Sequence, residues 1–248
     1  MLVAYDSNED ILTMAEHISS QFNQELETVR TMVMKMGGLV EQQLQNVIKG
    51  LEGNNSGLLQ EVVAADRTVN EMEVSIDDQC QLIIARRQPA AGDLRLVLTV
   101  TRIITDLERI GDEVKKIALY GNGLISKNGV LPHQFHDLNR LAQRSLGMIH
   151  TALDAFARLD ATVVVQLNKE DDLLDYEYDN LLRQQITYMM EDPRTISTSL
   201  DTLFMFKAIE RIGDHALNVS EHVVYLAKGI DIRHSPMEEV KKVSGVNE

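Results

Sequence analysis

Two carboxylates spaced four residues apart occur twice in this sequence, each time within the same five-residue segment, Glu-Arg-Ile-Gly-Asp. The copies begin at Glu108 and Glu210, an offset of 102 residues. On a helix, positions i and i+4 lie one turn apart on one face, so both carboxylates of a copy can converge on one cation. Ligation by oxygen alone favours Mg, Mn, Ca or Fe over Zn. The sequence therefore predicts two metal sites, with the ligands Glu108, Asp112, Glu210 and Asp214.

The repeated segment also admits a structural interpretation. Around it the copies diverge: Asp106, Glu113 and Lys115 align with Ala208, His215 and Leu217. A solvated charged face gives no reason to keep five residues identical while their neighbours change. Glycine inside a helix costs about 1 kcal/mol relative to alanine, so a helix that packs closely against the glycine would be a reason to keep it. Such close packing, or an arginine–carboxylate pair, would preserve the segment without a metal. Both interpretations stay open from the residues alone, and we favour metal binding.

The apolar residues around each copy predict where the carboxylates point. At about 100° per residue, Ile103, Leu107 and Ile110 lie roughly 100–160° from Glu108 on one side of the helix. Asp112 lies about 40° away on the other side. The same holds for the second copy. We therefore expect the carboxylates to face outward from the helix bundle.

A carboxylate pair binds a metal weakly without further ligands. Thr105, Asn218 and Glu221 share the face of the two pairs, but none of them is duplicated in the other copy. His215 and His222 lie beside the second pair, and either would be able to complete its site. A solvated or partner-facing histidine is the commoner situation.

The elements that position these residues are predicted to be helices. Apolar residues recur at heptad spacing, as in the run Phe22, Leu26, Val29, Val33, Met36 and Val40. Six helices follow from this rhythm and from the glycines and prolines between them, at residues 20–52, 58–88, 94–121 (opened by an N-cap at Asp93), 134–160, 162–191 and 197–229. No strand-like alternation is evident.

The first three helices match the last three in order and length. We therefore predict an all-α protein of two tandem, pseudo-symmetric three-helix bundles. The predicted divisions are an N-terminal tail at 1–19, the first bundle at 20–122, a linker and the second bundle at 123–233, and a polar C-terminal tail at 234–248.

Composition narrows the class of protein. The formal net charge of −14 over 248 residues argues against nucleic acid and anionic lipid as direct partners. The single cysteine, Cys80, excludes an intramolecular disulfide, indicates a reducing compartment and is expected to be a small buried thiol. No basic leader and no apolar run of roughly 18 residues is present, so we expect a cytoplasmic protein without membrane insertion.

Several segments together resemble the PhoU family of phosphate transport accessory proteins. They are the two Glu-Arg-Ile-Gly-Asp helices, Met36–Leu44, Ala85–Pro89, Asp93–Leu96 and Thr187–Asp192. The resemblance spans about residues 16–234. It implies two similar three-helix bundles, a homodimer, and metal bound at two E(D)-x-x-x-D motifs, which fall on Glu108 with Asp112 and on Glu210 with Asp214. Lys116 and Asn218 stand where the family has a further acidic residue, which implies a weakly held ion or none.

The resemblance also implies a function. Members of this family repress the phosphate-starvation response by linking the ATPase subunit of the phosphate ABC transporter to a sensor histidine kinase. We therefore expect a non-enzymatic adaptor that contacts both proteins. The alternative is a helical-bundle metalloenzyme with the same carboxylates as ligands. Outward-facing carboxylates and the lack of inward Glu-x-x-His pairs on the motif helices weigh against an enzyme.

Overall fold

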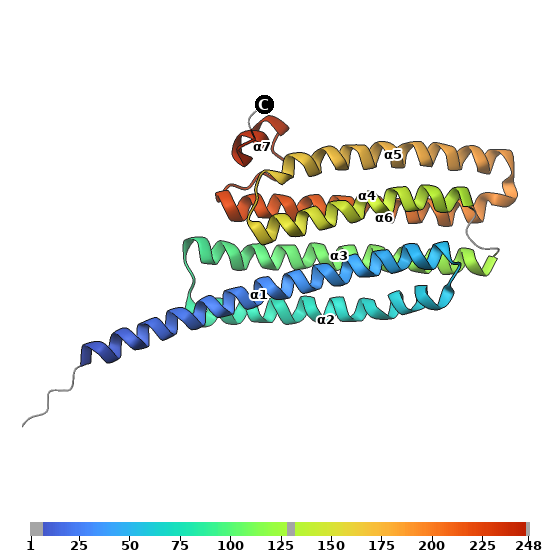
Figure 1. Ribbon diagram of the computed structural model, residues 1–248. Coiled ribbons are helices and arrows are strands. Elements are labelled where there is room, and N and C mark those ends of the chain that lie inside the picture. Colours follow the sequence, from blue (N-terminus) through green and yellow to red (C-terminus); the bar gives the residue numbers. More distant parts are fainter. Residues whose placement is uncertain (1–6, 128–131, 247–248) are drawn as a thin grey trace, which may run out of the picture.

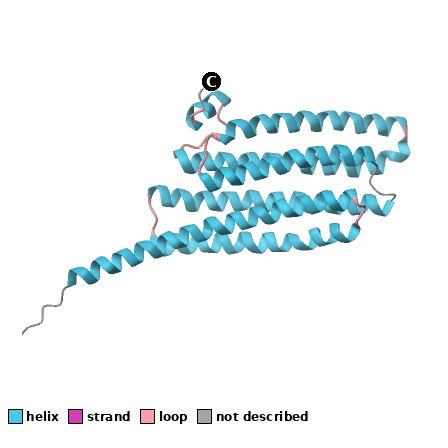
Figure 2. Cartoon of the chain, in the orientation of Figure 1, coloured by secondary structure: helices cyan, strands magenta, loops and turns pink. Residues whose placement is uncertain are grey.

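The computed structural model describes residues 7–127 and 132–246, which form helices and no strand (Figure 2). The helices are α1 (Ser7–Glu52), α2 (Ser56–Arg87), α3 (Ala91–Lys127), α4 (Pro132–Arg158), α5 (Val163–Glu191), the 3-10 turn η1 (Pro193–Thr195), α6 (Ile196–Lys228) and α7 (Met237–Ser244). The all-α prediction is confirmed. Within the described residues, no helix combines the length and the apolarity that crossing a bilayer requires.

The long helices form two bundles that lie against each other (Figure 1). Helices α1, α2 and α3 pack together, as do α4, α5 and α6. The bundles meet where α3 packs along α6, the most extensive helix contact in the molecule, and where α1 packs on α4. One continuous apolar core contains residues from all six helices. The motif helices α3 and α6 therefore lie at the centre of the molecule, with other helices on several sides.

The predicted heptad seam of α1 is buried. Val29, Val33, Met36 and Val40 all lie in the core. The turn after α1 ends in Asn55, whose side chain accepts a hydrogen bond from the Leu58 backbone N–H and so caps the N-terminus of α2. At the other end of α2, Gln88 adopts a left-handed conformation before Pro89, which stops the helix.

Three predicted boundaries are wrong. Helix α1 begins at Ser7, because residues 7–19 contain no glycine or proline to interrupt it, so the predicted tail at 1–19 is largely helical. Asp93 lies in the first turn of α3 and is not its N-cap, since α3 begins at Ala91. Helix α3 also continues through Gly121 to Lys127. Residues 1–6, 128–131 of the predicted linker, and 247–248 lie outside the described residues.

The extension of α3 has a physical reason. A Cβ at Gly121 would lie 2.5 Å from a methyl carbon of Leu51, so the glycine permits α1 and α3 to pack closely there. Beyond it, Lys127 forms a 2.7 Å ion pair with Asp201 of α6. Tyr120 stacks on Phe204 of α6 with a centroid distance of 5.2 Å. These contacts outweigh the poor helix propensity of glycine.

The predicted polar C-terminal tail contains a helix. Helix α7 places Val240 in a small apolar cluster with Val164, Val165 and Ile232. Gly245 ends α7 in a left-handed conformation. The spacing of Met237, Val240 and Val243 supplies the apolar side that the sequence interpretation overlooked.

Cys80 is fully buried, as expected, and burial raises the pKa of its thiol to about 12. Because the thiolate is the nucleophile, the folded protein should not react with iodoacetamide at pH 8 over an hour. The same sample in denaturing urea should be alkylated fully, as measured by intact mass. Rapid labelling of the folded protein would contradict this placement of Cys80.

Candidate functional site

Each repeated segment lies near the middle of its helix and faces one helix of its own bundle. A Cβ at Gly111 in α3 would lie 3.3 Å from Val69 Cγ1 and 3.8 Å from Asp66 Oδ1, both in α2. A Cβ at Gly213 in α6 would collide with the side chain of Leu174 of α5. The predicted close helix approach at the glycines is thus present.

The second motif helix contacts α5 in the same way as the first contacts α2. A Cβ at Gly213 would also lie 3.5 Å from Asp171 Oδ1. Asp66 and Val69 of α2 therefore correspond to Asp171 and Leu174 of α5, both offset by 105 residues. By the same offset, Asn70 corresponds to Asp175. Each motif is thereby paired with two oxygen-bearing side chains from a second helix.

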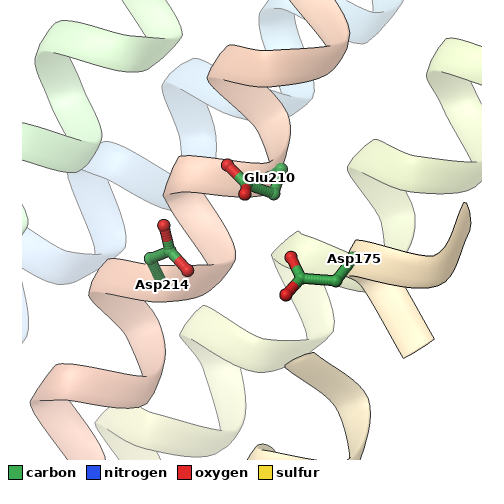
Figure 3. Close-up of side chains that lie close together, drawn as sticks. All are labelled: Asp175, Glu210 and Asp214. Carbon is green, nitrogen blue, oxygen red and sulfur yellow. The ribbon is translucent and has the colours of Figure 1, made fainter. Parts of the chain in front are cut away.

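The carboxylates converge most closely in the second bundle. One oxygen from each of Asp175, Glu210 and Asp214 lies within 4.8 Å of the other two. Figure 3 shows Asp175 reaching from α5 toward the two motif carboxylates on α6. We call Asp171, Asp175, Glu210 and Asp214 the second acidic cluster, and Asp66, Asn70, Glu108 and Asp112 the first.

The expectation that all four motif carboxylates face outward is wrong for Glu210, which is only 7% exposed. Glu108 and Asp112 are half-buried, and Asp214 is exposed. The carboxylates do lie on the face of α3 and α6 that is turned away from the apolar seam of each helix. Helices α2 and α5 cover part of that face, because they pack against the motif glycines.

The second acidic cluster is short of positive charge. Burial, followed by repulsion from Asp214 and Asp175, raises the pKa of Asp171 to about 7. Burial and the charge of Asp214 also raise the pKa of Asp175. Burial raises the pKa of Glu210 as well, against a hydrogen bond from Lys207 that lowers it. Carboxylates held together at this cost are the groups that a bound cation stabilises.

The first acidic cluster contains a lysine. Lys115 Nζ donates to Asp66 Oδ2 at 2.7 Å and lies 3.9 Å from Asp112 Oδ1. Burial and then repulsion from Asp112 raise the pKa of Glu108. The hydrogen bond to Asp66 raises the pKa of Lys115, so the lysine stays charged.

Unpaired oxygens test whether these residues fit a metal ion. Among the described residues, four buried oxygens of the two clusters have no hydrogen-bond partner: Asp66 Oδ1, Asn70 Oδ1, Asp171 Oδ1 and Glu210 Oε2. A buried acceptor without a donor is costly, and a coordinated cation would satisfy it. The oxygen-only donor set fits a hard cation such as Mg, Mn or Fe better than Zn.

The other candidate ligands lie elsewhere. Asn218 donates to Asp106 at 3.4 Å, and His215 and His222 are buried against the same carboxylate at 3.0 and 3.1 Å. Neither histidine is solvated or completes the second acidic cluster. Thr105 donates to the Thr101 carbonyl at 3.0 Å. Burial raises the pKa of Glu221, against the charges of His222, His234 and Arg233 and not those of either acidic cluster.

The motif arginines do not neutralise the motif carboxylates. Arg211 forms a 2.8 Å ion pair with Glu113, which is buried in α3 across the boundary between the bundles. Arg109 is exposed. The arginine–carboxylate pair predicted as an alternative to metal binding therefore stabilises the packing of α3 on α6. It involves no carboxylate of the two acidic clusters.

The sequence interpretation missed Asp66, Asn70, Asp171 and Asp175. A signal for them exists, because Asp171-x-x-x-Asp175 has the spacing of the repeated carboxylates and Asp66-x-x-x-Asn70 has it in a weaker form. The similarity between α2 and α5 is weaker than that between α3 and α6, which share five identical residues in a row. A pair of polar residues four apart is also common on solvated helices, so the signal becomes specific only once the helices are placed.

Comparisons with known proteins agree with this arrangement. The model of the PhoU domain matches residues 33–120 and 138–223, one match in each bundle. The phosphate-specific transport system accessory protein PhoU of Escherichia coli K12 is 45% identical over 236 residues, covering 94% of this chain and 96% of that protein. Its homologue from Pseudomonas putida is 45% identical over 228 residues, covering 92% of this chain and 89% of that protein.

Two solved structures share the fold. The crystal structure of PhoU from Pseudomonas aeruginosa is 44% identical, with a TM-score of 0.81, and the match covers 84% of this chain and 100% of that one. The phosphate transport system regulatory protein PhoU from Streptococcus pneumoniae is 25% identical, with a TM-score of 0.77, covering 85% and 98%. Sequence and structure thus agree along nearly the whole chain. The chain belongs to the PhoU family.

Proposed function

We propose that this protein is a non-enzymatic regulator of phosphate homeostasis that represses the phosphate-starvation response when phosphate is plentiful. It would contact the ATPase subunit of the phosphate ABC transporter and the sensor histidine kinase, in the cytoplasm and as a homodimer. The observation that carries this proposal is the 45% identity to a phosphate-specific transport accessory protein over nearly the whole length of both chains. Two matched bundles support an adaptor over an enzyme, since no nucleophile–base pair is evident among the described residues.

The acidic clusters have a part in this function. Glu108, Asp112, Glu210 and Asp214 would hold divalent or trivalent cations, assisted by Asp66, Asn70, Asp171 and Asp175 from the neighbouring helices. The bound ion supplies positive charge that joins two helices of a bundle through their carboxylates. The buried oxygens without a hydrogen-bond donor support this assignment.

Removing the motif carboxylates tests the metal's role. We expect the quadruple variant Glu108→Gln, Asp112→Asn, Glu210→Gln and Asp214→Asn to keep the helical circular dichroism of the wild type, because the amides preserve shape and relieve repulsion. It should lose Mn²⁺ binding, and it should fail to repress a phosphate-starvation reporter in a bacterium that lacks its own PhoU protein. A matched control replaces four exposed glutamates, at positions 52, 61, 238 and 239, with glutamine. Collapse of the helical signal would show that the motif is structural.

Partner binding tests the adaptor role directly. The purified protein should capture the transporter ATPase subunit and the kinase's cytoplasmic region in separate pull-down experiments. If neither partner is captured at low or high phosphate, with or without Mn²⁺, the adaptor proposal fails even if metal binding is intact.

A further inference from the structure

The two acidic clusters are built alike but differ in their lysines. In the first cluster, Lys115 Nζ lies 2.7 Å from Asp66 Oδ2, 3.9 Å from Asp112 Oδ1, and within electrostatic reach of Glu108. Asp66 is 3% exposed, so this ammonium group compensates a buried charge. Lys115 thus lies between carboxylates of α2 and α3 and supplies the positive charge that a metal ion bound to both helices would supply.

The second cluster has no such group at that position. The residue equivalent to Lys115 by the 102-residue offset is Leu217. Asp66 and Asp171 each keep a buried Oδ1 without a hydrogen-bond donor, but among the described residues only Asp66 accepts a hydrogen bond from a lysine through its other oxygen. Asp175 replaces Asn70, which adds a carboxylate, while Tyr178 replaces Glu73, whose charge acts on Glu108. The two clusters therefore differ chiefly in the lysine that joins the carboxylates of α2 and α3.

Lys207 of the second cluster does not fill the same place. It occupies the position equivalent to Thr105, donates to Glu210 Oε1 at 2.5 Å, and lies over the ring of Tyr178 at 5.2 Å from its centroid. Glu210 Oε2 remains without a donor, and the oxygens of Asp175, Glu210 and Asp214 still converge. Lys207 therefore compensates part of the charge of this cluster, including that of Asp214 and Asp175, but it does not join the carboxylates of α5 to those of α6 by hydrogen bonds.

From these contacts we infer that the two metal sites are inequivalent: Lys115 acts as a built-in cation in the first acidic cluster, and a divalent cation binds preferentially at the second. This inference rests on the proposed metal binding and specifies its location. The ligands are Glu210 and Asp214 of α6 with Asp171 and Asp175 of α5.

The expected difference in affinity is large. A divalent cation entering the first cluster must either displace the ammonium of Lys115 from buried Asp66 or bind close to its charge. Repulsion over roughly 4 Å near a protein surface, after screening, corresponds to a preference for the second cluster of at least about tenfold in dissociation constant. The same charge difference predicts that removing Lys115 opens the first cluster.

Mn²⁺ titration with detection of free Mn²⁺ by electron paramagnetic resonance tests the inference. We expect one tight site per wild-type chain, lost in Asp214→Asn and kept in Asp112→Asn. The variant Lys115→Leu, which carries the residue found in the second repeat, should bind two ions, and adding Asp112→Asn should remove only the new site. Lys49→Leu, which removes an exposed lysine of α1, is the charge-matched control and should bind one ion.

A second variant is needed because Lys115→Leu leaves the buried Asp66 carboxylate without its ion-pair partner, which can unfold the protein. Lys115→Gln keeps a hydrogen-bond donor without the charge and should also gain a site, with the wild-type helical circular dichroism. Two equal sites in the wild type, or a single site in both Lys115 variants, would overturn the inference while leaving metal binding intact. The absence of Mn²⁺ binding in every variant would refute the metal proposal itself and this inference with it.

Discussion

Replacing Asp106 with alanine is expected to lower the free energy of unfolding by roughly 3–5 kcal/mol, the cost of removing one partner from a buried polar cluster. Asp106 of α3 is 6% exposed and accepts hydrogen bonds from His215 at 3.0 Å and His222 at 3.1 Å, both in α6. The substitution leaves both histidines buried without this acceptor. Because α3 and α6 join the two bundles, the loss weakens the contact on which the whole architecture depends.

The Asp106 carboxylate also makes the stability of the contact between α3 and α6 depend on pH. Burial alone would raise its pKa, but the hydrogen bonds from His215 and His222 hold the pKa lowered at about 2, against a usual value of 3.8. A depressed folded-state pKa contributes stability that is present above about pH 4 and is lost as the pH falls toward 2. The wild type should therefore lose this contribution in that window, and Asp106→Ala should not.

Urea denaturation followed by circular dichroism measures the effect of Asp106→Ala. Asp78→Ala, which removes an exposed aspartate of α2, should change the free energy of unfolding by less than about 0.5 kcal/mol. Equal stability of Asp106→Ala and the wild type at pH 7 would show that the histidine–aspartate contacts do not hold the bundles together.

The sequence was sufficient for the fold because its signals are local and repeated. The heptad seam of α1, the stop at Pro89 and the duplicated segment follow from residue types at short spacing, and they predict two similar helical bundles. The boundaries that failed depended on distant contacts. Gly121 ends a helix in isolation, but in this fold Leu51 packs against it and α3 continues.

The candidate site was predicted only in part, for a related reason. The spacing of Glu108 and Asp112 or of Glu210 and Asp214 identifies one helix's contribution to a cluster. It does not show which helix packs opposite, so Asp66 and Asp171 were missed. Nor does it show that Asp106, aligned with Ala208 and taken as free divergence, binds two histidines across the bundles. Asp106 and His215 differ from their equivalents in the other repeat because they bind each other across the boundary between the repeats.

The same substitution at equivalent positions of the two clusters is expected to have opposite effects on stability. The pKa of Asp171 is raised to about 7 by burial and then by the charges of Asp214 and Asp175. A folded-state pKa raised above 3.8 means that stability is fully present below about pH 4 and is lost as the pH rises through 7. In the metal-free protein at pH 8, Asp171→Asn should therefore raise the free energy of unfolding, by roughly 2–4 kcal/mol.

Asp66→Asn should instead destabilise the protein, because it breaks the ion pair between buried Asp66 and Lys115. Denaturation in urea with EDTA, from pH 4 to pH 8, measures both variants against the wild type. The wild type should lose stability toward pH 8 and Asp171→Asn should not.

Saturating Mn²⁺ should stabilise the wild type at pH 8, because a ligand that binds only the folded state shifts the folding equilibrium. A stabilising Asp66→Asn, or an Asp171→Asn that behaves as the wild type at every pH, would show that the two clusters do not differ in uncompensated charge.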